Sequence, residues 1–177
     1  MPPSSSIRQL QSLQGKADFL RIFIANYAEI TKGFMRFLKK CVPFLWDDFA
    51  QRSFDVLKKA LTSAPLLSPP DYSRDFLLYL TVAESTIGMV LVQEDDALCE
   101  HVMYYLSRGL VCPETRYSPI EKLSFAVVHV VQRLQHYILL RKNLILVAVN
   151  PFKLVLSRQV IGGKYNRWIL ILQEFDL

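Results

Sequence analysis

Apolar residues recur every three or four positions along roughly the first third of the chain, a spacing that predicts amphipathic helices. A first helix is expected from about Ser6, with Ser5 or Ser6 as its N-cap, on the spacing of Leu10, Leu13, Ala17, Leu20 and Ile24. A second helix is expected over 31–40, before Pro43. A third is expected from a cap at Asp47 to about Ser63, with an apolar stripe of Phe49, Phe54, Leu57 and Leu61.

Prolines at positions 65, 69 and 70 mark a loop. This loop is the candidate boundary between a helical segment at 1–70 and a second domain at 71–177. Beyond it, the apolar residues form short continuous runs separated by polar turns. Such runs predict three strands of an antiparallel meander, at 76–82, 87–93 and 102–106.

A long helix is expected from Pro119 to about Leu140, because Ser118 suits the N-cap and proline suits the first turn. The β-branched run at 144–149 predicts a fourth strand. A strand that follows a long crossover can pair in parallel with an earlier strand. The order of elements therefore predicts an α/β fold with a mixed sheet, followed by short helices at 151–156 and 164–174.

The composition is that of a folded chain, since 51% of the 177 residues are hydrophobic, and intrinsic disorder is excluded. No apolar stretch is long enough and sufficiently free of polar residues to predict a membrane span. The first residues lack the pattern of a secretory signal. The three cysteines are Cys41, Cys99 and Cys112, of which Cys112 is expected in a loop with Pro113, and they form no CxxC pair. We therefore expect free thiols and an intracellular location, in the cytoplasm or the nucleus.

The basic excess is concentrated near the end of the chain. Residues 122–173 contain eight Lys and Arg and no Asp or Glu, whereas residues 1–121 are nearly balanced. Such a block attracts polyanions, above all nucleic acid, through long-range attraction and counterion release. A solvated basic face is the alternative, and charge alone does not decide between the two.

Several stretches of sequence add a resemblance that covers most of the chain: LQGKADFLRIFIANYAEI, FLWDDFAQRSFDVLKKALTSAP, IGMVLVQEDD, YYLSRGL, ETRYSPIEKLSFAVVHV, NPFKLVLSR and GGKYNRWILILQEFDL. They resemble the part of a gypsy-class, plant-like retrotransposon Pol polyprotein that follows the catalytic core of the reverse transcriptase. The resemblance implies thumb/connection helices followed by a ribonuclease-H-like domain that is truncated at its C-terminus.

The resemblance also places the family's catalytic acids onto apolar residues. Active ribonuclease H uses carboxylates from several elements to hold two Mg²⁺ ions. The matching positions here are Val82, within the run Thr-Val-Ala-Glu, then Leu123 and Val149. No residue matches the paired aspartates of the polymerase site. The resemblance therefore implies a ribonuclease-H-like fold without its catalytic acids.

The carboxylates that are present support the same interpretation. Mg²⁺ needs oxygen ligands, and no carboxylate occurs from Lys122 through Gln173. Glu84 and Glu121 remain as candidates for displaced metal ligands. Glu84 follows Val82 by two positions and would share its face on a continuing strand. Glu121 matches a non-catalytic glutamate of the family.

The candidate nucleic-acid contacts are basic residues of the C-terminal block: Arg141, Lys142, Lys153, Arg158, Lys164 and Arg167. Lys and Arg would contact phosphates and would not read the base sequence. Tyr165 and Trp168 are candidate stacking groups, although a core position is expected for Trp168. Surface or half-buried positions are expected for His129 and His136, whose spacing does not suit a metal pair.

Three hypotheses about function follow from this sequence. The leading hypothesis is a non-catalytic connection/ribonuclease-H-like module without a cofactor. It would scaffold the rest of a Pol polyprotein and hold an RNA–DNA hybrid, with no membrane partner. The first alternative is an active Mg²⁺-dependent ribonuclease H with relocated ligands. The second is a retroelement fragment without a function of its own.

Overall fold

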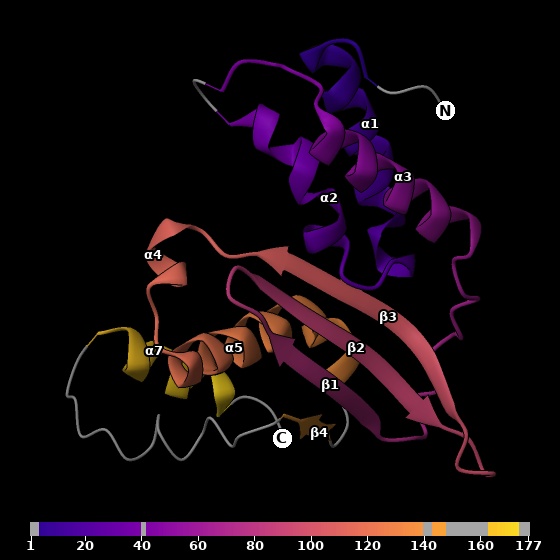
Figure 1. Cartoon of the computed structure of the whole chain (residues 1–177). Helices are drawn as coiled ribbons and strands as arrows, with labels where there is room; N and C mark the ends of the chain where they lie inside the picture. Colours follow the sequence, from indigo (N-terminus) through magenta and orange to yellow (C-terminus); the bar gives the residue numbers. More distant parts are fainter. Residues whose placement is uncertain (1–3, 40–41, 140–142, 148–162, 174–177) are drawn as a thin grey trace.

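The computed structural model describes residues 4–39, 42–139, 143–147 and 163–173, and Figure 1 shows a helical segment next to a sheet covered by helices. The described elements are α1 (Ile7–Leu20), the 3₁₀ turn η1 (Arg21–Phe23), α2 (Tyr27–Met35), the 3₁₀ turn η2 (Arg36–Leu38), α3 (Asp48–Thr62), β1 (Phe76–Val82), β2 (Thr86–Glu94), β3 (Glu100–Gly109), α4 (Cys112–Thr115), α5 (Pro119–Ile138), β4 (Asn143–Leu146) and α7 (Lys164–Leu172).

The helical segment has a hydrophobic cluster of its own. Its most buried members come from all three helices and the turn after η1, and include Leu10, Ile24, Phe34, Phe54 and Leu57. The predicted caps are confirmed. The Ser6 side chain accepts a hydrogen bond from the backbone N–H of Gln9, and the Asp47 carboxylate accepts one from Ala50. The first and third helices therefore begin where the sequence predicts.

Glycine allows α2 and α3 to pack closely. A Cβ added at Gly33 would lie 2.1 Å from Ser53 Oγ and 2.7 Å from the backbone oxygen of Phe49. Both distances are shorter than any van der Waals contact, so only a residue without a side chain fits at this crossing. The separation of the two helices is thus fixed by one glycine.

Three predictions in and beyond this segment are wrong in detail. The second helix begins at Tyr27, earlier than expected, after Asn26 in the left-handed conformation (φ 54°). Phe49 does not belong to the buried stripe: it is 44% exposed and lies under the Arg36 guanidinium, 5.5 Å from the ring centre. Cys112 begins the short helix α4 rather than a loop, because the Glu114 side chain caps the backbone N–H of Val111.

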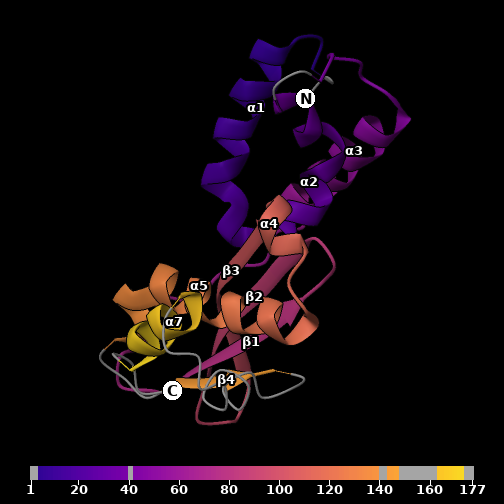
Figure 2. The same ribbon diagram turned by 90° about the vertical axis from the view of Figure 1, so that its left-hand side faces the viewer.

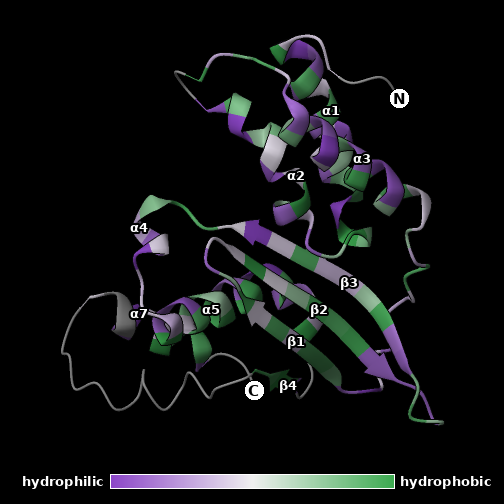
Figure 3. Ribbon diagram, in the orientation of Figure 1, coloured by the Kyte–Doolittle hydropathy of each residue, from purple (hydrophilic) through white to green (hydrophobic). Residues whose placement is uncertain are grey.

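The sheet has the order β3-β2-β1-β4. The first three strands form the expected antiparallel meander, and β4 pairs in parallel with β1. Alternate residues of β1, namely Phe76, Leu78 and Leu80, are buried under α5. Figure 3 shows the apolar residues that run along β1 and β2. The predicted α/β class with a mixed sheet is confirmed.

Helices α5 and α7 form the layer on one face of the sheet, as Figure 2 shows from the side. Trp168 on α7 is only 6% exposed and packs against Val128 of α5, so its expected core position is confirmed. No helix among the described residues has the length and apolar character needed to cross a membrane. The helix expected at 151–156, like Cys41, lies outside the described residues.

Candidate functional site

The positions that the resemblance assigns to catalytic acids lie in the main hydrophobic cluster. Val82 is the last residue of β1 and is half-buried against this cluster, and Leu123 is a buried member of it on α5. Val149 lies outside the described residues. Both described positions therefore carry hydrocarbon side chains, which have no oxygen to bind a metal ion.

The carboxylates considered as displaced ligands are placed differently from the expectation. Because β1 ends at Val82, Glu84 lies in the exposed β1–β2 turn, and the alternation that would give it the face of Val82 does not extend to it. The carboxylate of Glu121 accepts hydrogen bonds from the backbone N–H and the hydroxyl of Ser118, which completes the capping box of α5. Glu121 thus stabilises a helix start.

Lys122, which follows Glu121 on α5, contacts the turn that contains Glu84. The Lys122 ammonium donates a hydrogen bond to the backbone oxygen of Glu84 at 2.9 Å. Mg²⁺ needs several oxygen ligands, and a fixed positive charge next to the site repels a second cation. Among the described residues there is no group of three His, Cys, Asp or Glu side chains able to hold a metal ion. The described residues at this place do not fit Mg²⁺.

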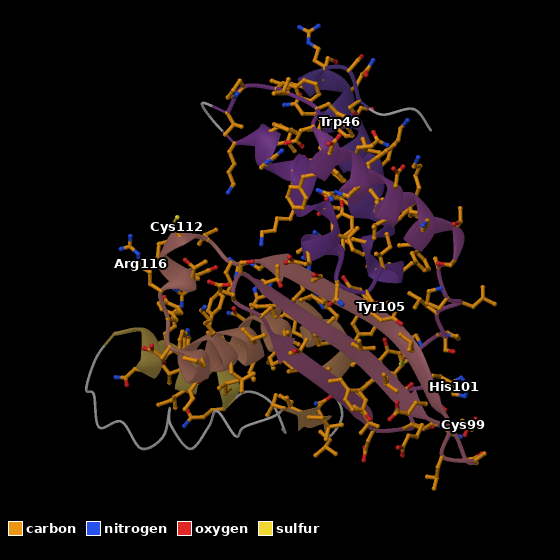
Figure 4. All side chains as sticks on the ribbon, in the orientation of Figure 1. Trp46, Cys99, His101, Tyr105, Cys112 and Arg116 are labelled. Atoms are coloured by element: carbon orange, nitrogen blue, oxygen red, sulfur yellow. The ribbon has the colours of Figure 1, made fainter. Side chains whose placement is uncertain are left out.

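A basic pocket lies at the edge strand β3, where the helical segment meets the sheet. Its volume is about 320 Å³, and its lining comes from η1, β3 and α5. Figure 4 labels one of the lining residues, Tyr105, on β3 below the helical segment. The basic side chains of the lining are Arg21, Arg108, Arg133 and His129, and the other titratable lining residues are Tyr104 and Tyr105. Three separate elements thus bring three guanidinium groups to one place.

Arg108 is the most strongly held of these cations. Its Nη2 donates to Glu114 Oε1 at 2.9 Å, and its guanidinium carbon lies 5.1 Å from the centre of the Phe125 ring. Among the described residues, its buried Nη1 has no hydrogen-bond partner. A buried donor without an acceptor costs free energy.

His129 lines both this pocket and a neighbouring one. Its ring stacks on Phe125 at 6.2 Å between centroids. Burial lowers the pKa of His129 below its usual value of 6.5, the guanidinium groups of Arg108 and Arg133 lower it further, and Glu114 opposes them. His129 is therefore neutral at pH 7, and the positive charge of the pocket comes from arginine.

A second pocket, of about 490 Å³, lies between α5 and α7, and His129, Arg167 and Trp168 are among its lining residues. Arg167 is exposed there and Lys164 is the first residue of α7, and their contacts with phosphate stay predictions. The other predicted contacts, Arg141, Lys142, Lys153 and Arg158, lie outside the described residues.

The arginines of the β3 pocket were not predicted as a site. Arg133 follows His129 by four residues, so the helical spacing could have paired them. Arg21 and Arg108 are far apart in sequence, and only the docking of the helical segment brings them together. Two hydrogen bonds at 3.0 Å hold this docking: the Ala28 N–H donates to Ser107 Oγ, and Lys32 Nζ donates to Ser85 Oγ.

Comparison with known families places these features in context. Residues 46–145 match the model of the RNase H-like domain found in reverse transcriptase. The chain belongs to this family. The β3 pocket of this RNase H-like domain lies partly within the matched region. Arg108, His129 and Arg133 belong to that region, whereas Arg21 precedes it.

Known relatives are much longer than this RNase H-like domain. It is 28% identical to the retrovirus-related Pol polyprotein from transposon opus of Drosophila melanogaster, over 99% of the chain but only 19% of the polyprotein. Two solved structures of a foamy viral protease–reverse transcriptase have the same fold. The dRH form in complex with double-stranded DNA has a TM-score of 0.81 at 18% identity, covering 98% of this chain and 31% of that one. The form in complex with an RNA/DNA hybrid has a TM-score of 0.76 at 20% identity, covering 97% and 24%. The predicted ribonuclease-H-like fold is confirmed.

Proposed function

We propose that this RNase H-like domain is a non-catalytic connection module of a gypsy-class, plant-like retrotransposon Pol polyprotein. It scaffolds the reverse transcriptase and holds an RNA–DNA hybrid without cutting it. The observation that carries this proposal is that Val82 and Leu123, to which the resemblance assigns catalytic acids, are apolar and pack in or against the main hydrophobic cluster. The lysine bound to the Glu84 carbonyl supports it further, since it brings a positive charge to the turn that carries the candidate ligand Glu84.

Binding of the hybrid rests on the basic face of the domain. The β3 pocket and the exposed Arg167 present guanidinium groups, which contact phosphate oxygens without reading bases. The proposed contacts in the C-terminal block are Arg141, Lys142, Lys153, Arg158, Lys164 and Arg167. The foamy viral enzyme, which has the same fold, is known in complex with double-stranded DNA and with an RNA/DNA hybrid. An A-form-like hybrid would be recognised by its backbone and groove shape.

The proposed domain limits are a helical thumb/connection-like segment at 1–70 and the RNase H-like domain at 71–177. Two separate hydrophobic clusters support this division. In the parent polyprotein, the partners of the module would be the neighbouring Pol domains and the nucleic acid.

A titration with a labelled RNA–DNA hybrid in the presence of Mg²⁺ tests the proposal. Binding and cleavage are read in the same samples at about 50 and about 200 mM salt. We expect binding that weakens steeply with salt while the hybrid stays intact. Cleavage that disappears in Glu84→Gln or Glu121→Gln would replace the proposal with an active ribonuclease H. A folded protein that neither binds nor cuts would favour a fragment without a function of its own.

A further inference from the structure

We propose that the β3 pocket binds one phosphate group, presented by the backbone of a nucleic acid that crosses the junction between the helical segment and the sheet. This inference rests on the proposed function and assigns its central contact. The pocket only partly overlaps the C-terminal basic block, because Arg21 and Arg108 precede residue 122 whereas Arg133 lies within the block.

The charge of the pocket suits a phosphate. None of the described residues that line it carries a carboxylate, and Glu114, which pairs with Arg108 from outside the lining, offsets one of the three positive charges. Guanidinium groups form bidentate hydrogen bonds with phosphate oxygens, whereas a lysine acts as a point charge. Three arginines converging from different elements are therefore a more specific arrangement than a solvated basic face.

The hydrogen-bonding state of the pocket also indicates an anionic ligand. Arg108 is oriented by its ion pair and by the Phe125 ring, so its position is fixed before a ligand arrives. Its buried Nη1 lacks an acceptor among the described residues. The volume of about 320 Å³ accommodates a phosphate together with part of its sugars.

The position of the pocket gives phosphate binding a structural consequence. Arg21 belongs to η1, whereas Arg133 belongs to α5 on the other side of the β3 edge. A phosphate that contacts both would add a link between the two hydrophobic clusters. Binding should therefore stabilise the orientation of the helical segment relative to the sheet.

The test compares two double variants that lose the same charge. Arg21→Gln/Arg133→Gln removes two pocket arginines and keeps Arg108, which also pairs with Glu114. Arg8→Gln/Arg52→Gln removes two exposed arginines of α1 and α3 as a matched control. We expect the pocket variant to bind a labelled RNA–DNA hybrid at least about tenfold more weakly, with a slope of log Kd against log salt that is smaller by about two. The control should change less than about threefold.

A second measurement separates free phosphate from nucleic acid as the source of the group. The melting temperature is recorded in inorganic phosphate and in chloride at equal ionic strength. A rise in phosphate that the pocket variant loses and the control keeps supports the site. If both variants lose hybrid binding equally and respond equally to phosphate, the pocket is overturned while the proposed function stands. If the parent binds no hybrid, the proposed function fails, and the nucleic-acid backbone is overturned as the source of the phosphate group. A phosphate response that the pocket variant loses would then identify free phosphate as the ligand.

Discussion

Lys122 and Glu84 are joined by a hydrogen bond of 2.9 Å from the lysine ammonium to the backbone oxygen of the glutamate. This contact ties the first turn of α5 to the β1–β2 turn, next to Val82 and Leu123 in the sequence. It therefore joins two segments that carry positions to which the resemblance assigns catalytic acids.

Restoring two acids should create a response to Mg²⁺ that the parent lacks. The double variant Val82→Asp/Leu123→Glu places carboxylates at a half-buried and a buried position, and we expect a loss of roughly 3–5 kcal/mol in stability without metal. Mg²⁺ should recover part of that loss in thermal melts. A rise of the parent's melting temperature with Mg²⁺ would contradict the non-catalytic proposal, because the unaltered chain would then hold the metal.

Glu121 should behave as a capping residue. Glu121→Gln keeps an acceptor for the Ser118 N–H, so we expect little change in stability. Ser118→Ala removes the side chain that caps α5 and should cost about 0.5–2 kcal/mol. Urea unfolding of both variants measures this difference. A large effect of Glu121→Gln that depends on Mg²⁺ would instead assign Glu121 a metal-binding role.

Gly33 should tolerate no side chain. Gly33→Ala forces a Cβ into Ser53 and the Phe49 backbone, and we expect a loss of roughly 1–3 kcal/mol, seen as earlier urea unfolding of the helical segment. Gly15→Ala is the matched control, since no atom lies within 4 Å of its Cβ position in α1. This control should stabilise the chain by about 0.4–1 kcal/mol. Equal behaviour of the two variants would rule out the close α2–α3 crossing.

The half-buried His129 should make stability depend on pH. Its pKa is lowered in the folded chain, mainly by burial, so below the usual value of 6.5 the unfolded chain binds the proton more readily. The stability present above that pH is lost as the pH falls toward the folded-state pKa. His129→Gln should flatten this dependence in urea unfolding between about pH 7.5 and pH 5. His136→Gln, exposed on the same helix, should leave the profile as in the parent.

The sequence predicts the sheet and the long helix well because their signals are local. The run Phe76–Val82 is mostly apolar and follows the polar Asp75, and the boundaries of β1 agree with it. Ser118 and Pro119 likewise predict the start of α5, because both residue types favour the first turn of a helix. Phe49 shows the limit of such signals. Its helical spacing agrees with a buried stripe, but its ring is exposed and lies under the Arg36 guanidinium.

The candidate site was less accessible to sequence reasoning. The assignment of acid positions to Val82 and Leu123 follows from the resemblance, motif by motif, and stays a prediction. The β3 pocket could not, because Arg21 and Arg108 meet only through tertiary docking at Ser107 and Ser85. The concentration of charge predicts nucleic-acid contacts in the block 122–173, whereas two of the three pocket arginines precede that block.

The parallel pairing of Phe76 with Asn143 has a consequence for biosynthesis. The meander closes through short turns, but β4 reaches β1 only after β2, β3 and α5 have been made, and such long-range contacts form slowly. Pulsed hydrogen exchange during refolding should protect the amides of β1 that face β2 before those that face β4. On the ribosome, one edge of β1 therefore stays unpaired until residue 143 emerges, and during that interval the nascent chain is open to edge-to-edge association with its neighbours.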